Sequence, residues 1–236
     1  MCKLLVKLII VGVLFWTEIP VLAQSTAIVD DATLSLPEVS GFEILTGSSP
    51  SFLEQDRWTV PSNRLLALYE RVSKKEDRAL QNHRKIAVQS YRKAEKIHVS
   101  ISEFQALRTQ FQISNQSLLD TARINAGMHQ TEGRETALEK PVKIEDVHAI
   151  EMFNENNDWS ISMLTRIDYS MEGKGSIRKV PIILSTTIFL LKGKICFLYI
   201  FSPHDTEDSK KWVKAQTIDW LSNAYGGNLI LHNIRG

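Results

Sequence analysis

The fold is decided by one apolar stretch, Val180-Pro-Ile-Ile-Leu-Ser-Thr-Thr-Ile-Phe-Leu-Leu-Lys-Gly-Lys-Ile-Cys-Phe-Leu-Tyr-Ile-Phe201, the longest outside the N-terminus. Lys192-Gly193-Lys194 divides it into two β-rich runs, a pattern typical of a hairpin. A transmembrane helix is the alternative, but it would bury two lysines at roughly 2.5–3.5 kcal/mol each. The stretch therefore predicts a buried hairpin, around which the other elements pack.

The N-terminus has the pattern of a secretory signal. Lys3 and Lys7 precede an apolar run, and Val21-Leu-Ala23 places small residues before a cleavage point. The prediction is a cleaved signal over residues 1–23 and a periplasmic or secreted chain with no integral membrane span after cleavage. The alternative is an uncleaved anchor that tethers the domain.

The charge balance argues against a nucleic-acid partner. The chain has 28 Lys and Arg against 27 Asp and Glu, and residues 1–23 contain two lysines and one glutamate. The predicted mature chain is therefore formally neutral, whereas proteins that bind nucleic acid usually carry a basic excess. Cys196 would remain as a lone cysteine. Its position inside an apolar run predicts a buried thiol and not a catalytic one.

Two helices and further strands follow from periodicity. Strands are predicted over residues 42–46, 64–72, 85–91 and 147–153. A helix is predicted from Ser102, which forms a capping box with Gln105. Strict alternation over 159–171 predicts an antiparallel strand with one buried face and one face in water, with Trp159 pointing inward.

The C-terminal region predicts a second helix and a short strand. The helix begins with Asp205 as N-cap and places Trp220 toward the sheet. Gly226-Gly227 is expected to stop it, and an edge strand is expected over 229–234. Residues 24–40 are predicted to be a flexible leader, and residues 41–236 a single domain with a polar linker or mobile loop near 114–140. The predicted fold class is α+β, an antiparallel sheet of about six or seven strands with helices packed on one face.

Several of these stretches carry a family resemblance. They are 63–69, 162–166 and 190–203, followed by the helix with Trp212 and Trp220. The chain resembles a group of exported bacterial proteins of unassigned function. More remotely, its last 90 or so residues look like the closing unit of the PsbP/Mog1/DcrB type of α-β-α domain. The resemblance implies a binding or assembly accessory and transfers no functional residue.

No spacing typical of catalysis or metal binding occurs. The chain lacks His-x-x-x-His, Cys-x-x-Cys and Gly-x-Ser-x-Gly patterns. No catalytic, cofactor or metal residue is therefore predicted. His148 and Glu151 lie three apart, which on a regular strand directs them to opposite faces.

His204 and Trp212 are the candidate partner contacts. His204 lies where a strand gives way to a helix, and Trp212 lies off the apolar stripe that contains Trp220. The predicted function is an exported, non-enzymatic binding or assembly accessory with an unknown protein or envelope component as partner. The alternative is a periplasmic hydrolase with dispersed catalytic residues, which would require His204 or His148 to meet a carboxylate or serine in a cleft.

Overall fold

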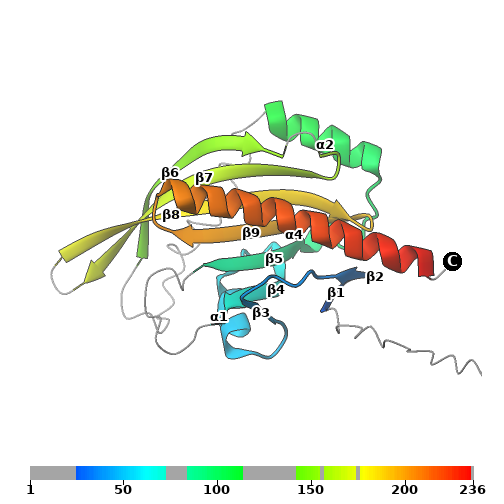
Figure 1. Ribbon diagram of the computed structural model, residues 1–236, viewed down its shortest axis with the longest axis horizontal. Helices are drawn as coiled ribbons and strands as arrows, with labels where there is room; N and C mark the ends of the chain where they lie inside the picture. Colours follow the sequence, from blue (N-terminus) through cyan, green and yellow to red (C-terminus); the bar gives the residue numbers. More distant parts are fainter. Residues whose placement is uncertain (1–24, 73–83, 114–141, 155–156, 174–175, 235–236) are drawn as a thin grey trace, which may run out of the picture.

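The computed structural model describes residues 25–72, 84–113, 142–154, 157–173 and 176–234, and it shows an antiparallel α+β fold (Figure 1). Seven strands form one sheet in the order β3-β4-β5-β9-β8-β7-β6, in which every neighbouring pair is antiparallel. The strands are β3 (Phe42–Leu45), β4 (Asn63–Arg71), β5 (Lys85–Tyr91), β6 (Val142–Phe153), β7 (Ser160–Gly173), β8 (Ser176–Leu191) and β9 (Lys194–Pro203). The predicted α+β class, with an antiparallel sheet of six or seven strands, is confirmed.

The hairpin formed by β8 and β9 lies inside the sheet, as predicted from the apolar stretch. Lys192 and Gly193 form its turn with φ of 50° and 75°, the positive values that a two-residue type I′ turn needs. The His98 ring lies so close to Gly193 that a Cβ there would be 2.1 Å from its Cε1 atom. Both the backbone angle and this contact therefore favour glycine. Within the described residues, no helix combines the length and apolarity that a membrane span needs.

One long helix, α4 (Glu207–Ile234), lies along one face of the sheet (Figure 1). Val213, Thr217 and Trp220 are buried on the predicted stripe, and the Trp220 ring packs edge-on against Phe189 at 5.4 Å between centroids. These contacts connect α4 mainly to β8 and β9. The helix therefore closes the core on this face.

The ends of α4 differ from the prediction. Thr206, and not Asp205, caps the helix, because its hydroxyl oxygen accepts a hydrogen bond from the Ser209 amide at 3.1 Å. The predicted stop at Gly226-Gly227 and the strand at 229–234 are wrong, since α4 continues to Ile234. Asn228 bonds to both backbone groups of Ser35 at 2.9 and 3.1 Å, and this tertiary contact offsets the cost of two helical glycines.

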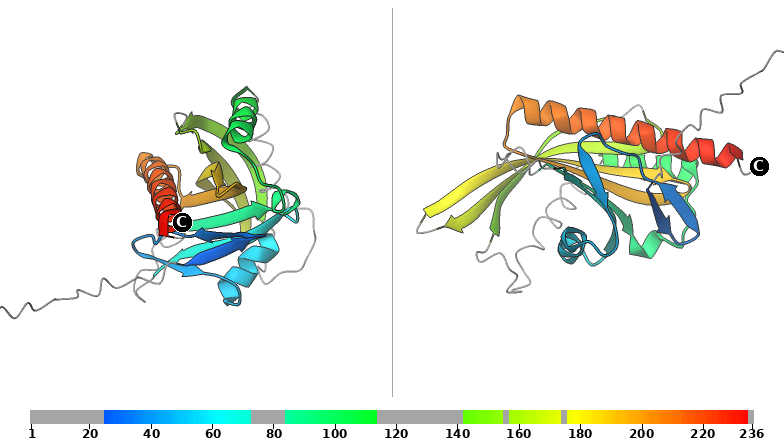
Figure 2. Two further views of the ribbon diagram at one scale, coloured as in Figure 1. Left: turned by 90° about the vertical axis from the view of Figure 1, so that its right-hand side faces the viewer. Right: turned by 60° about the horizontal axis from the view of Figure 1, so that its bottom comes forward.

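Two shorter helices contact the opposite face of the sheet. Phe52 of α1 (Pro50–Trp58) packs with Leu65 and Leu68, and Phe104 of α2 (Ile101–Ile113) packs with Ile161 and Met163. The left view of Figure 2 shows α4 on one side of the curved sheet and α1 and α2 on the other. The sheet therefore lies between two helical layers.

Two details of the structure differ from the predicted pattern, one on β7 and one at the start of α2. The first residues on the expected water-facing side of β7, Ser160 and Ser162, are buried, whereas Trp159 is 40% exposed. The capping box of α2 lies two residues earlier than predicted. The Ser100 amide donates to the Glu103 carboxylate at 2.8 Å, and the Ser100 hydroxyl accepts from the Glu103 amide at 3.3 Å.

A separate small hairpin occupies the segment predicted as a flexible leader. Strands β1 (Thr26–Val29) and β2 (Ala32–Ser35) pair with each other, and Val29 and Leu34 enter the core with 0% and 1% exposure. Burial of these side chains explains why the segment is ordered. The predicted signal over 1–23 and the whole of the predicted linker near 114–140 lie outside the described residues.

Candidate protein-contact site

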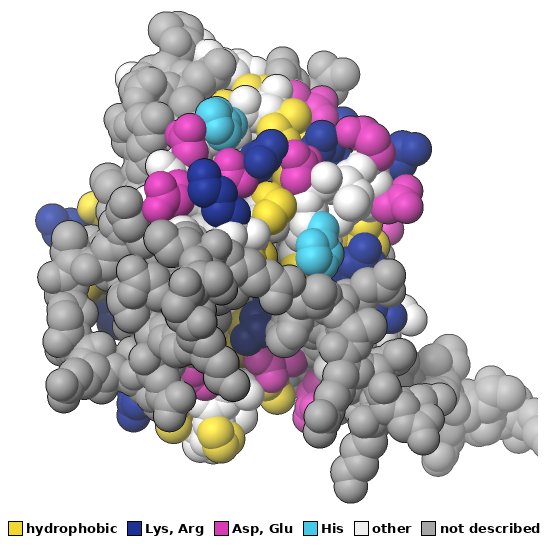
Figure 3. Space-filling view, turned by 90° about the vertical axis from the view of Figure 1, so that its left-hand side faces the viewer, with side chains coloured by type: hydrophobic (Ala, Val, Ile, Leu, Met, Phe, Trp, Pro, Cys, Tyr) yellow, Lys and Arg dark blue, Asp and Glu magenta, His cyan; other side chains and the backbone are white. Residues whose placement is uncertain are grey.

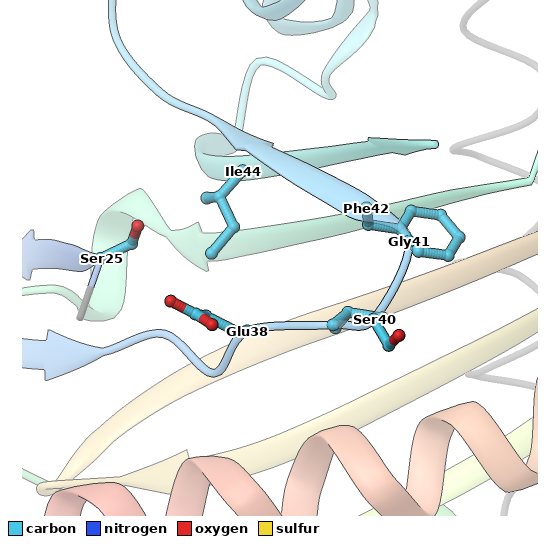
Figure 4. A pocket seen from close by; sticks show the side chains of 7 residues that line it. Ser25, Glu38, Ser40, Gly41, Phe42 and Ile44 are labelled. Atoms are coloured by element: carbon cyan, nitrogen blue, oxygen red, sulfur yellow. The ribbon is translucent and has the colours of Figure 1, made fainter. Parts of the chain in front are cut away.

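A hollow lies beside β3, the strand at one edge of the sheet (Figure 4). Its volume is about 380 Å³. The lining residues are Ser25, Glu38, Val39, Ser40, Gly41, Phe42 and Ile44. The hollow therefore lies between the edge strand and the segment that leads into it.

The local sequence builds this hollow by turning the chain sharply before β3. Gly41 has φ of 80°, which a glycine adopts without strain, and the Phe42 amide donates to the Val39 carbonyl oxygen at 3.0 Å. Segment 36–41 is thereby held next to the strand. In Figure 4 the Glu38 carboxylate lies across the hollow from Ile44 and points toward the side of Ser25, which places a negative charge at the hollow.

Phe42 connects the hollow to an aromatic and cationic stack. Its ring stacks on Trp212 with 6.2 Å between centroids and an interplanar angle of 20°. The Arg84 guanidinium lies over the same indole, with Cζ 4.3 Å from the ring centroid. This distance is typical of a cation–π contact, which holds the guanidinium in place. We call these three residues the Trp212 stack.

The charge of the stack is set by its neighbours. Burial lowers the pKa of Arg84, the nearby positive charge of Arg71 lowers it further, and Asp208 opposes both effects. The side chain remains a cation at neutral pH, because arginine ionises far above that range. Its Nε atom is buried and has no hydrogen-bond partner among the described residues. The stack therefore presents a fixed positive charge beside an aromatic surface.

The two predicted contact residues lie near the start of α4. Trp212 is half-buried within the stack, whereas His204 lies in the connection from β9 to α4 with φ of 70°. The His204 amide donates to the Pro181 carbonyl oxygen at 3.0 Å. The described ring contacts of Trp212 are with Phe42 and Arg84 and not with His204. A partner role for both residues stays a prediction.

Sequence reasoning missed Glu38, Phe42, Ile44 and Arg84. Phe42 and Ile44 lie in a predicted strand, and Arg84 directly precedes another, so the elements themselves were found. What the sequence lacked was the strand order, which puts β3 at the edge and brings Arg84 under α4. The only usable signal was the position of Trp212 off the buried stripe.

One of the two histidines considered for hydrolysis, His148, does meet a carboxylate, but on an exposed strand. His148 Nε2 lies 3.0 Å from Asp146 Oδ2, and both side chains are more than half exposed. They belong to β6, the edge strand at the opposite end of the sheet from the hollow. This pair therefore lacks the cleft that the hydrolase alternative requires.

A β-bulge corrects the prediction for Glu151. The register shifts between Ala149 and Glu151, so His148 and Glu151 lie on the same face. The Glu151 carboxylate pairs with Lys214 of α4 at 2.9 Å. Across the parts of the chain that the structure describes, no group of three His, Cys, Asp or Glu side chains is placed to hold a metal ion.

Acidic and basic side chains alternate over the end of the molecule where α4 begins (Figure 3). The Asp205 carboxylate forms ion pairs with Arg166 at 3.0 Å and with Lys210 at 3.2 Å. Arg166 also forms an ion pair with Asp168 at 3.0 Å. These pairs join the first turn of α4 to β7. They fix the helix end that carries Trp212.

Cys196 is fully buried, as predicted, and burial raises the pKa of its thiol to about 12. We expect no reaction with a thiol reagent in the native state and complete reaction in denaturant, because only the thiolate attacks. The measurement is DTNB labelling in a Cys2→Ser background, so that one thiol is observed. Rapid labelling of the native protein would contradict the buried position.

Comparison with known proteins leaves the family open. No family model and no curated protein sequence matches the chain, so the resemblance to the PsbP and DcrB type stays a prediction. Among solved structures, the chain is similar to the Ran-binding protein Mog1p of Saccharomyces cerevisiae, with 10% identity, TM-score 0.34, and coverage of 82% of this chain and 86% of that one. A mutant form of Mog1 gives 11% identity, TM-score 0.30, and 85% coverage of each chain. Such values do not identify a partner or an activity.

Proposed function

We propose that the chain is an exported, non-enzymatic binding or assembly accessory that contacts a partner protein at β3 and the Trp212 stack. The observation that carries the proposal is the stack itself. A half-buried indole that contacts both Phe42 and Arg84 lies beside a hollow at the sheet edge. Tryptophan and arginine are the residues most enriched at the energetic centres of protein interfaces.

The geometry also supports a rigid contact surface. The Trp212 ring is stacked on one residue and covered by another, so little side-chain entropy remains to be lost on binding. The ion pairs of Asp205 hold the same end of α4. Export is part of the proposal and is supported by the sequence of residues 1–23. The N-terminal residue of the mature chain would test it.

We expect Trp212→Ala to reduce capture of the partner about tenfold or more, because truncating an interface tryptophan commonly costs 2 kcal/mol or more. The measurement is affinity capture from the native source with quantitative mass spectrometry. Ile218→Ala is the matched control, since Ile218 lies on the same helix and is 43% exposed outside the stack.

A specific partner should be recovered by the wild type and Ile218→Ala and depleted with Trp212→Ala. Circular dichroism of all three proteins establishes that each is folded. Equal recovery by the two variants would show that the Trp212 stack is not the contact surface.

A further inference from the structure

We infer that β3 pairs with an extended segment of the partner, which adds a strand to the sheet and carries a basic residue opposite Glu43. This inference rests on the proposed function and names the way in which the partner is bound. It follows from the backbone register of β3, from the hollow beside it and from two carboxylates at the edge.

The register shows which backbone groups of β3 face outward. The Val72 amide donates to the Gly41 carbonyl oxygen at 3.0 Å, so Gly41 and Val72 form a hydrogen-bonded pair. Such pairs alternate along an antiparallel ladder, and the next is Glu43 with Glu70. Phe42 and Ile44 therefore direct their N–H and C=O groups away from β4. Because the Phe42 amide already bonds to Val39, the Phe42 carbonyl and both Ile44 groups face the edge.

These outward groups meet the conditions for strand addition. In the described part of the chain, β3 is the last strand of the sheet on this side, and the hollow lies alongside it (Figure 4). Exposed edge groups of this kind are a template for a further strand, which supplies main-chain hydrogen bonds in binding by β-augmentation. Phe42 and Ile44 line the hollow, so the added strand would run beside them.

The charges at the edge select the partner. Glu38 and Glu43 are exposed, and Glu38 lines the hollow. Because side chains alternate along a strand, Glu43 lies on the face of β3 opposite Phe42 and Ile44. Opposite charges across neighbouring strands stabilise a pair, and the positions without hydrogen bonds bring side chains closest. Within the sheet, Glu43 pairs with another acidic residue, Glu70 of β4, so no basic side chain of β4 lies directly opposite it. A basic side chain is therefore expected opposite Glu43.

The same register disfavours a second copy of this chain as the occupant. An antiparallel pairing of two β3 strands that uses every outward group places Phe42 of each strand opposite Ile44 of the other. Glu43 would then lie directly opposite Glu43 of the second copy. Like charges in that position are destabilising, so a different protein with the opposite charge is the better fit.

The test uses synthetic peptides of about six residues, the usual strand length, in which Val alternates with either Lys or Glu. We expect the Lys peptides to slow hydrogen exchange of the Ile44 amide and to bind at least about tenfold more tightly than the Glu peptides. Ile44→Pro should abolish this binding, because it removes the outward N–H without touching the ladder to β4. Ile44→Val is its matched control.

Glu43→Lys should reverse the preference in favour of the Glu peptides. Equal binding of both peptide series, or full binding by Ile44→Pro, would overturn the inference. Protection of Ile44 that depends on protein concentration without peptide, with a dimer in sedimentation, would assign the edge to a second copy. If Trp212→Ala loses the native partner while Ile44→Pro retains it, strand addition fails and the proposed function stands.

Discussion

Trp220→Ala is expected to destabilise the protein by about 3–5 kcal/mol, the range for removing a large aromatic side chain from a core. Trp220 is 1% exposed and packs edge-on against Phe189, which is fully buried. Truncation removes this contact and leaves a cavity under α4. Since whole domains are stable by about 5–15 kcal/mol, the loss would be a large fraction of the total.

The free energy of unfolding should be measured by urea titration followed by circular dichroism, because the substitution removes a fluorophore. Trp220→Phe is the matched control and should lower the free energy of unfolding by less than Trp220→Ala does, since it keeps an aromatic ring against Phe189. A loss below about 1 kcal/mol for Trp220→Ala would mean that the indole is not part of the core.

The hairpin at 180–201 could be predicted because its signal is local. Two apolar runs rich in β-branched and aromatic residues flank Lys192-Gly193, and the turn needs only these two residues. The burial of Cys196 follows from the same pattern, since its strand is buried. Here sequence pattern, turn chemistry and burial agree.

The errors fall where distant contacts override local preference. Gly226-Gly227 would end an isolated helix, but Asn228 bonds to Ser35, 193 residues away in sequence. The same contact fixes β2, whose four residues are too few to predict a strand with certainty. Propensity describes a segment alone, whereas these segments are stabilised by each other.

The candidate site could be predicted only in part for the same reason. The offset of Trp212 from the buried stripe is visible in the sequence as a helical period. The edge position of β3 and the approach of Arg84 to Trp212 depend on the order of strands in the sheet. Strand order is a property of the whole fold, so Phe42 and Arg84 gave no signal of their own.

Lys194→Met is expected to cost about 2 kcal/mol and to loosen the β1–β2 hairpin. The Lys194 side chain is 3% exposed, and Nζ lies 2.8 Å from both an Asp31 carboxylate oxygen and the Glu95 carbonyl oxygen. Methionine fills a similar volume but leaves the Glu95 carbonyl without its donor, a loss of about 1–3 kcal/mol for a buried group. Hydrogen exchange should show faster opening of 26–35 than of β8 and β9.

The pH dependence of the protein's stability distinguishes the contribution of the Lys194–Asp31 ion pair from that of Lys194 packing. The hydrogen bond and the charge of Lys194 hold the pKa of Asp31 below its usual value. A carboxylate with a lowered pKa in the folded state stabilises the protein above its unfolded pKa, and this contribution is lost as the pH falls through the folded pKa. The Lys194→Met variant should not show this loss of stability as the pH falls. The control, Asp31→Asn, should also show no such loss of stability at acid pH. It should destabilise the protein less than Lys194→Met at neutral pH, because Asp31 is 82% exposed and Lys194 keeps its hydrogen bond to the Glu95 carbonyl oxygen. An unchanged acid profile in Lys194→Met would show that this ion pair does not couple the hairpin to the sheet.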